Sequence, residues 1–285
     1  MGLCLVHGRA LVGLHSPTVT VEVHMANGLP SFTLVGLADV EVKEARERVR
    51  SAILNSGLDF PHNQRITVNL APADLPKDSG RLDLPIALGI LAASGQIDAT
   101  RLNGFEFAGE LSLSGQLRPV RGALAMSLAL RRQATRTRLV LPPDSAEEAA
   151  LVPEAEVFRA RHLLDVVQRF LPSSSEPPPE PGEGWVRLAG QPPAATLQHP
   201  DLADVKGQSG AKRALEIAAA GGHSVLMVGP PGSGKSMLAQ RFAGLLPPMS
   251  VDEALEAAAI ASLAGRFDMA RWGQRPTAQP HHTAS

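Results

Sequence analysis

The sequence predicts an α+β domain followed by an incomplete α/β domain that carries a glycine-rich loop. Three observations support this division. Strand-like and helix-like segments alternate over residues 1–171, with hairpin-like strand pairs at the start. A stretch rich in proline, serine and glutamate follows, and such a composition cannot form a packed core. Beyond it, an apolar run leads directly into a glycine-rich loop and then into a helical pattern.

The first domain, residues 1–171, begins with strands. The first 25 residues favour strands at 11–14 and 18–24, because β-branched residues alternate with others in the second of these segments. Asn27 and Gly28 predict a turn, and Asp39 suits the N-cap of a helix. Pro85 is tolerable in the first turn of a helix. The pattern predicts strands at 32–37, 66–70, 106–111 and 139–141, and helices at about 40–55, 83–94 and 122–132.

Residues 172–193 are predicted to be an extended, solvated linker, because proline and glycine prevent regular structure there. The second domain then covers residues 194–285. A helix is expected at 211–220, followed by a buried parallel strand at 223–228, where the run is continuously apolar. A further helix is expected from Ser236 to about Leu246.

The loop between that strand and helix has the P-loop pattern, which binds ATP. Glycines let successive backbone N–H groups turn toward a phosphate, and the helix N-terminus adds its positive dipole end. Lys235 brings a charge to the β and γ phosphates, and the Ser236 hydroxyl is a ligand for Mg²⁺. The predicted cofactor-binding residues are Gly229, Pro230, Pro231, Gly232, Ser233, Gly234, Lys235 and Ser236.

Hydrolysis of ATP needs more than this loop, because a carboxylate at the end of a second strand must hold Mg²⁺ and orient water. The acidic residues after Ser236 do not follow a strand-like apolar run. They are Asp252, Glu253, Glu256 and Asp268. We therefore assign no catalytic residue and expect ATP turnover near background.

The chain resembles the magnesium-chelatase-like AAA+ ATPase family of the ComM/YifB type. The matching stretches are residues 28–32, 35–37, 44–50, 53–57, 65–77 and 83–95, together with the P-loop. Residues 280–285 resemble a stretch that lies inside the ATPase core of that family, so the resemblance implies truncation within the domain. It also implies a homo-oligomeric ring, with six copies expected, that uses ATP to move branched DNA in transformation and recombination.

The resemblance further implies that the first domain is similar to the Lon protease domain, a ribosomal S5 domain 2-like fold. Proteolysis of the Lon type needs a serine activated by a lysine later in the chain. Here Arg81 stands about where the serine would fall, and no lysine occurs between Lys77 and Lys206. Ser79 with Lys77 is the only local substitute. We therefore expect a scaffold for oligomer or DNA contacts rather than a protease.

Two arginine groups are candidates for contact with nucleic acid. Arg46 and Arg50 lie four residues apart beside Lys43 and Glu47, which favours a solvated face with salt bridges over a phosphate-binding stripe. A denser cluster later in the chain leaves DNA contact open. It consists of Arg131, Arg132, Arg136 and Arg138.

Composition sets the remaining limits. The net charge of −1 does not indicate a particular class of binding partner. Cys4 is the single cysteine of the sequence, so an internal disulfide is excluded. The longest apolar run, residues 84–93, is too short to span a bilayer, and the N-terminus has no secretory pattern, so the cytoplasm is expected. Two other functions stay open: a magnesium chelatase subunit that inserts Mg²⁺ into a porphyrin, and a non-enzymatic interaction module with an inert P-loop.

Overall fold

The computed structural model describes residues 2–36, 39–77, 79–133, 136–172, 184–189 and 199–277, without the side chains of residues 39–43 and 79. The chain divides into two compact units. The first comprises residues 1–192 with 259–267, and the second comprises residues 193–258 with 268–285. No helix among the described residues is long and apolar enough to cross a membrane.

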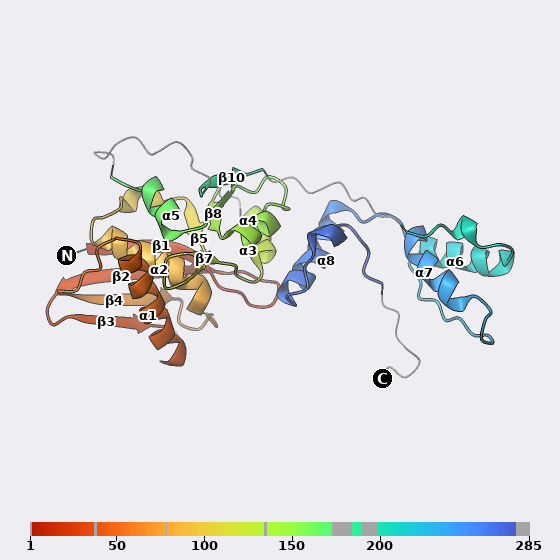
Figure 1. Ribbon diagram of the computed structural model, residues 1–285, viewed down its shortest axis with the longest axis horizontal. Coiled ribbons are helices and arrows are strands. Elements are labelled where there is room, and N and C mark those ends of the chain that lie inside the picture. The colour runs from red at the N-terminus through yellow and green to blue at the C-terminus, as the bar shows by residue number, and fades with distance from the viewer. Residues whose placement is uncertain are drawn as a thin grey trace. The chain divides into compact units, whose positions relative to one another are not determined.

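The first unit is built on an eight-stranded mixed sheet in the order β10-β9-β8-β5-β1-β2-β4-β3 (Figure 1). Strands β1 and β2 pair antiparallel, as do β2 and β4, whereas β1 pairs parallel with β5. A separate small sheet joins β6 and β7 antiparallel. The strands are β1 (Gly2–Arg9), β2 (Thr18–Asn27), β3 (Ser31–Val35), β4 (Gln64–Ala71), β5 (Phe105–Phe107), β6 (Glu110–Leu111), β7 (Leu117–Arg118), β8 (Arg138–Leu141), β9 (Val157–Arg159) and β10 (Val186–Leu188).

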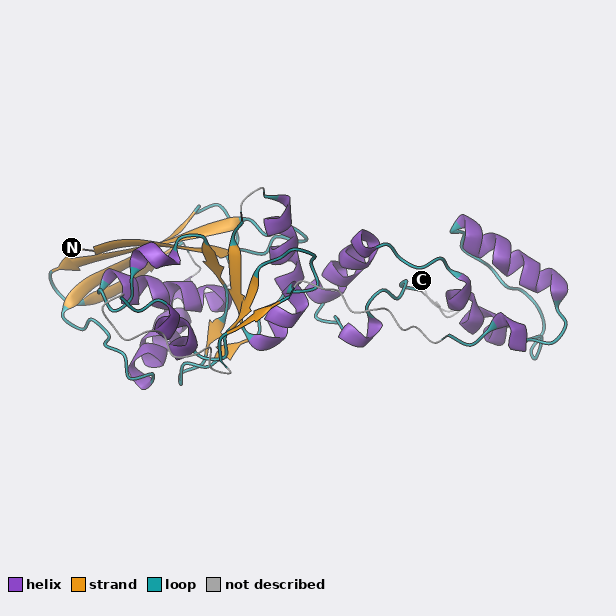
Figure 2. Cartoon of the chain, turned by 90° about the horizontal axis from the view of Figure 1, so that it is seen from above, coloured by secondary structure: helices purple, strands orange, loops and turns teal. Residues whose placement is uncertain are grey.

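Helices α1 and α2 pack against each other, and α2 packs on β1 and β2, so the main core lies between this helix layer and the sheet (Figure 2). The opposite face of β1 and β2 exposes Leu3, Leu5 and His24. The helices are α1 (Asp39–Asn55), α2 (Ser79–Ala93), α3 (Ala123–Arg132), α4 (Pro143–Ala149), α5 (Leu163–Arg169), α6 (Ser209–Gly221), α7 (Lys235–Leu245) and α8 (Val251–Leu263), with 3₁₀ turns η1 (Ala99–Leu102), η2 (Leu202–Asp204) and η3 (Met269–Arg271).

Most of the predicted elements of the first unit are present, with three corrections. The single strand predicted at 106–111 is divided, because Phe105–Phe107 pairs in the large sheet as β5 and Glu110–Leu111 pairs in the small sheet as β6. Residues 11–14 form a turn closed by a bridge between Val12 and His15, not a strand. Helix α2 begins at Ser79, four residues before the predicted start at Asp83, because its first turn packs under the loop at Gly109. Arg81 therefore belongs to the helix rather than to a loop.

Part of the span predicted as a linker joins the sheet. Residues 186–188 form β10, which pairs antiparallel with β9. Trp185 beside it is buried and stacks on Phe158 with ring centroids 5.1 Å apart, and it also meets Phe105 and Phe170. Aromatic burial of this size outweighs the low strand propensity of the flanking residues. Residues 173–183 and 190–198 lie outside the described residues.

The second unit has a small core between η2, α6 and α7. Its buried residues are Leu202, Val205, Leu215 and Leu238. The strand predicted at 223–228 is not formed, and Leu226 and Val228 are each 89% exposed. A strand exists only when a neighbour completes its hydrogen-bond ladder, and no strand is present among the described residues of this unit. The prediction of a buried strand at 223–228 is therefore wrong.

Candidate functional site

The glycine-rich loop lies between α6 and α7 in the second unit. Helix α6 ends at Gly222, whose left-handed backbone closes the helix, and the chain reaches the loop without regular structure. Gly232 and Gly234 have φ of +80° and +84°, a region that side chains with a Cβ rarely adopt. Gly234 is also the N-cap of α7, and its carbonyl oxygen accepts from the Leu238 amide at 3.0 Å. The backbone thus turns sharply into a helix N-terminus.

Lys235 is the first residue of α7, and its side chain folds back over the loop. Its Nζ donates to the carbonyl oxygens of Gly229 and Pro230, both at 2.8 Å, and to the hydroxyl of Ser233 at 3.4 Å. The ammonium group is therefore held against the loop carbonyls, beside the N-terminus of α7. A cation and a helix dipole at one point favour an anion there.

A contact from outside the motif supports the loop. Gln208 precedes α6 and has φ of +54°, and its Nε2 donates to the Ser233 carbonyl oxygen at 3.4 Å. A Cβ placed on Gly234 would lie 2.9 Å from the same Nε2. The P-loop pattern by itself does not point to Gln208, because this residue lies 25 positions upstream of Ser233.

The donor set fits a phosphate group better than a metal alone. Ser236 lies exposed in the first turn of α7, where a hydroxyl can bind Mg²⁺ held by a phosphate. Among the described residues no group of three or more histidine, cysteine, aspartate or glutamate side chains could hold a metal ion. Mg²⁺ at this loop would therefore depend on the nucleotide for most of its ligands.

Three of the four acidic residues after the loop lie at helix starts, and the fourth, Glu256, lies within α8. Asp252 and Glu253 lie in the first turn of α8, and Asp268 caps η3 by accepting from the Ala270 amide. Glu253 and Ser250 exchange hydrogen bonds of 2.8 Å and 3.2 Å, a capping box. The backbone N–H of Ser250 and the nearby Arg275 lower the pKa of Glu253. The carboxylates at these helix starts stabilise the helix ends.

Asp204, upstream of α6, joins two elements of the second unit. It is exposed at the end of η2, and its carboxylate lies 3.6 Å from Arg241 of α7. Asp201, not Asp204, caps η2. The ion pair of Asp204 therefore links η2 to the helix that follows the loop.

The residues considered for a Lon-type dyad are placed in the first unit. The Lys77 Nζ donates to the carbonyl oxygens of Pro72 and Leu75, which lie in its own loop. Burial lowers the pKa of the Lys77 ammonium group. Arg81 is buried, and its Nη2 donates to the Arg121 carbonyl oxygen at 2.9 Å. The Ser79 side chain lies outside the described part, so its pairing with Lys77 stays untested.

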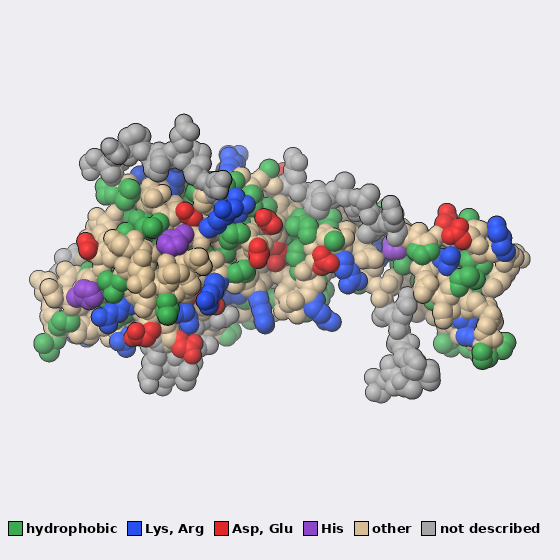
Figure 3. Space-filling view, in the orientation of Figure 1, with side chains coloured by type: hydrophobic (Ala, Val, Ile, Leu, Met, Phe, Trp, Pro, Cys, Tyr) green, Lys and Arg blue, Asp and Glu red, His purple; other side chains and the backbone are tan. Residues whose placement is uncertain are grey.

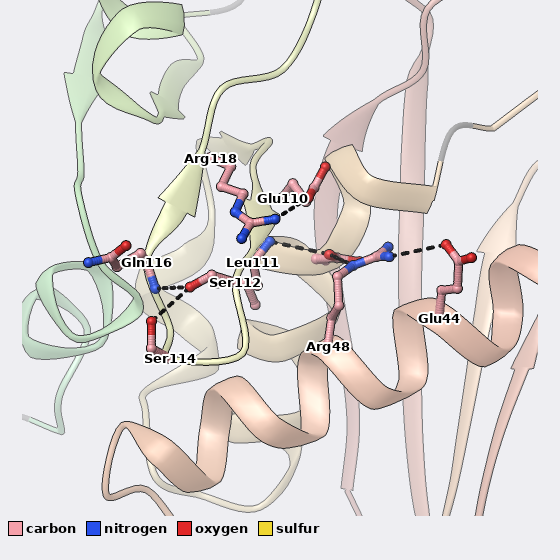
Figure 4. A network of polar contacts seen from close by, with 9 residues as sticks. Glu44, Arg48, Glu110, Leu111, Ser112, Ser114, Gln116 and Arg118 are labelled. Atoms are coloured by element: carbon pink, nitrogen blue, oxygen red, sulfur yellow. Dashed lines mark hydrogen bonds and ion pairs between the residues drawn. The ribbon is translucent and has the colours of Figure 1, made fainter.

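A buried polar network lies beside these residues (Figure 4). Asp83 of α2 is fully buried and accepts from Arg48 Nε at 2.6 Å and from the Leu111 amide at 3.2 Å. Burial raises the pKa of Asp83 to about 7, although Arg48 and the Leu111 amide act in the opposite direction. Arg48 also reaches Glu44 at 3.5 Å. The sequence places the carboxylate of Asp83 at the start of a predicted apolar helix. This position was a signal for a buried ion pair, and our sequence reasoning did not use it.

The mixed α/β fold and the glycine-rich turn into a helix together indicate the class of protein to which this chain belongs. It is the class of proteins with a P-loop. Comparison with known families supports the same class. The family model described as "Subunit ChlI of Mg-chelatase" matches residues 21–145, and the one described as "Magnesium chelatase, subunit ChlI" matches residues 201–285.

Curated relatives narrow the assignment. The chain is 50% identical over 289 residues to the competence protein ComM of Haemophilus influenzae, and 48% identical over 286 residues to the uncharacterized protein YifB of Escherichia coli. Both matches cover 100% of this chain, and 55% and 54% of the relatives. The chain belongs to the magnesium-chelatase-like family that includes ComM and YifB. It spans about half the length of the curated relatives it matches.

Proposed function

We propose that residues 229–236 bind ATP together with Mg²⁺. The observation that carries this proposal is the position of the Lys235 ammonium, held on the loop carbonyls beside the N-terminus of α7. Gly232 and Gly234 keep the backbone open for phosphate oxygens, and Ser236 adds the hydroxyl for the metal. Family membership supports the proposal, because nucleotide and Mg²⁺ use is general among AAA+ proteins of the Mg-chelatase type.

Binding of a fluorescent ATP analogue with Mg²⁺ tests this site. We expect Lys235→Ala to weaken binding at least tenfold, because a charge-assisted contact to phosphate contributes about 1.5–3 kcal/mol. Lys206→Ala is the matched control, since Lys206 is an exposed lysine outside the motif. Equal affinity of the two variants, or no binding by the unmodified chain, would contradict the proposal.

We further infer that the protein acts as part of a ComM-type ATP-driven motor on branched DNA, assembled as a ring of copies in the cytoplasm. The name of the ComM relative, competence protein, supports a role in transformation. As part of the same proposal, the first unit is similar to the Lon domain and serves as a scaffold for that ring. Tighter binding to a four-way DNA junction than to a duplex, weakening with salt, is the expected result. Equal affinity for both substrates would count against it.

A magnesium chelatase subunit is the second candidate, because both matching family models carry that description. In that case the chain should stimulate insertion of Mg²⁺ into a porphyrin in the presence of the other chelatase subunits. Stimulation would overturn the DNA proposal, and its absence alongside junction binding would support it.

We also propose that this chain alone hydrolyses ATP near background. Among the described residues of the second unit no carboxylate follows a strand beside the loop. A phosphate-release assay with Lys235→Ala as the blank tests this. ATP turnover that disappears in the variant would contradict this proposal. A hydrolysis rate near background, together with intact ATP binding, would fit a module that holds the nucleotide without hydrolysing it.

A further inference from the structure

Two arginines of α1 lie on aromatic rings at the edge of the sheet in the first unit. The Arg46 guanidinium is 5.6 Å from the centroid of the Phe32 ring, and that of Arg50 is 5.8 Å from the centroid of Phe60. The two rings pack together at 5.9 Å between centroids. We name Arg46, Arg50, Phe32 and Phe60 the arginine–phenylalanine face.

The positive charges of this face have no carboxylate partner among the described residues. The ion pairs of α1 belong instead to Arg48, which holds Glu44 and Asp83. Glu47, on the same helix, is exposed and forms no ion pair within the described part of the chain. The buried Arg46 Nε has no described hydrogen-bond partner. Arg46 and Arg50 therefore form no ion pair among the described residues. On the same helix Arg48 pairs with Glu44, and the side chain of Lys43, which belonged to the expected face of salt bridges, lies outside the described residues.

We propose that the arginine–phenylalanine face binds the phosphodiester backbone of a nucleic-acid strand. Each guanidinium group lies over a ring, and this cation–π contact restricts its motion before a ligand arrives, so less side-chain entropy is lost on binding. A guanidinium fork pairs with phosphate oxygens through two parallel hydrogen bonds. Residues four apart lie about one helical turn from each other. Two fixed forks at that spacing suit neighbouring charges along one strand.

The other arginine group is a poorer candidate because carboxylates lie within it. Arg138 pairs with Glu156 at 3.3 Å, and Glu156 also lies 3.5 Å from Arg187. A cavity of about 440 Å³ beside it is lined by Arg131 and Arg136 but also by Glu154 and Glu156. Positive and negative side chains also alternate over the visible surface of the first unit (Figure 3). Arg132 and Arg136, which are exposed, therefore supply a control with the same loss of charge.

This inference rests on the DNA part of the proposed function, and one titration tests both. A fluorescent single strand and a four-way junction are titrated at several salt concentrations with the unmodified chain, with Arg46→Gln/Arg50→Gln and with Arg132→Gln/Arg136→Gln. We expect about a tenfold loss of affinity for the first double variant, with a salt slope less steep by about 1.5, because two phosphate contacts are removed. The control should keep affinity within about twofold.

The outcomes separate the two proposals. If Arg46→Gln/Arg50→Gln binds like the unmodified chain, this face is not the contact, although DNA binding stands. If the unmodified chain binds neither nucleic acid, or binds a polyglutamate peptide instead, both proposals are overturned. Circular dichroism and ATP-analogue binding verify folding. Should the glutamine variant unfold, Arg46→Lys/Arg50→Lys keeps the charge but loses the fork, and undiminished affinity in it would overturn the inference.

Discussion

At the scale of single residues, burial of one carboxyl group dominates the chemistry of the first unit. The pKa of Asp83 is raised to about 7 in the folded state by burial. The unfolded chain has an ordinary aspartate pKa near 3.9, so between these values the folded state binds more protons than the unfolded state. The free energy of unfolding contributed by this group is therefore greatest below about pH 4, and it falls as the pH rises toward 7.

Asp83→Asn removes this titration while keeping the shape of the side chain. We expect the unmodified chain to lose on the order of 2 kcal/mol of stability, relative to the variant, between pH 5 and pH 8. Urea unfolding of both proteins at the two pH values measures the difference. Asp59→Asn, at an exposed position, keeps Asp83 and should therefore lose the same stability as the unmodified chain between the two pH values. If the unmodified chain instead gained stability relative to Asp83→Asn between pH 5 and pH 8, the result would show that Arg48 keeps Asp83 ionised throughout this range.

At the scale of elements, the start of α7 depends on one backbone conformation. Gly234 caps this helix with φ of +84°. Alanine in the left-handed region costs about 1–2 kcal/mol, so Gly234→Ala should make the first turn of α7 open about tenfold more often. Hydrogen exchange of the Leu238 amide, which donates to the Gly234 carbonyl oxygen, reports that opening.

Gly210→Ala provides the matched control for this prediction. Gly210 lies in α6, and a Cβ added there meets open space. Alanine has the higher helix propensity, so exchange of α6 amides should slow or stay unchanged. Equal effects of the two substitutions would mean that the positive φ of Gly234 does not matter for the loop.

At the scale of the whole molecule, the two units have cores of very different size. The first unit buries a large cluster between its sheet and its helices, whereas the cluster beside the loop contains only Leu202, Val205, Leu215 and Leu238. Stability follows the apolar surface buried, so we expect two transitions in urea, with the second unit unfolding first.

Ligand linkage identifies the second unit's transition. At 100 times its dissociation constant, ATP with Mg²⁺ should raise the stability of that transition by about 2.7 kcal/mol and leave the other unchanged. Circular dichroism during urea titration measures both midpoints. Lys235→Ala should abolish the shift. A single transition, or a shift of both midpoints, would show that the two units unfold as one.

Local pattern determined much of this protein. Alternation of β-branched residues predicted β2, and a capping residue followed by a helical stretch predicted α1, because the backbone geometry of an element depends on neighbours within a few residues. The glycine spacing likewise predicted a sharp turn into α7, since the positive φ of Gly232 and Gly234 is a conformation that glycine adopts without strain. The order of these elements in the sheet did not follow from the sequence.

Tertiary contacts decided the rest. Only the fold shows that β5 lies beside β1 and that Arg48, not Arg46 or Arg50, pairs with Asp83, which lies 35 residues away. Only the fold shows that residues 223–228 remain without a ladder while residues 186–188 gain one. The physical reason is common to all of these: a strand or a buried charge is stabilised by partners distant in sequence, and no local pattern names those partners.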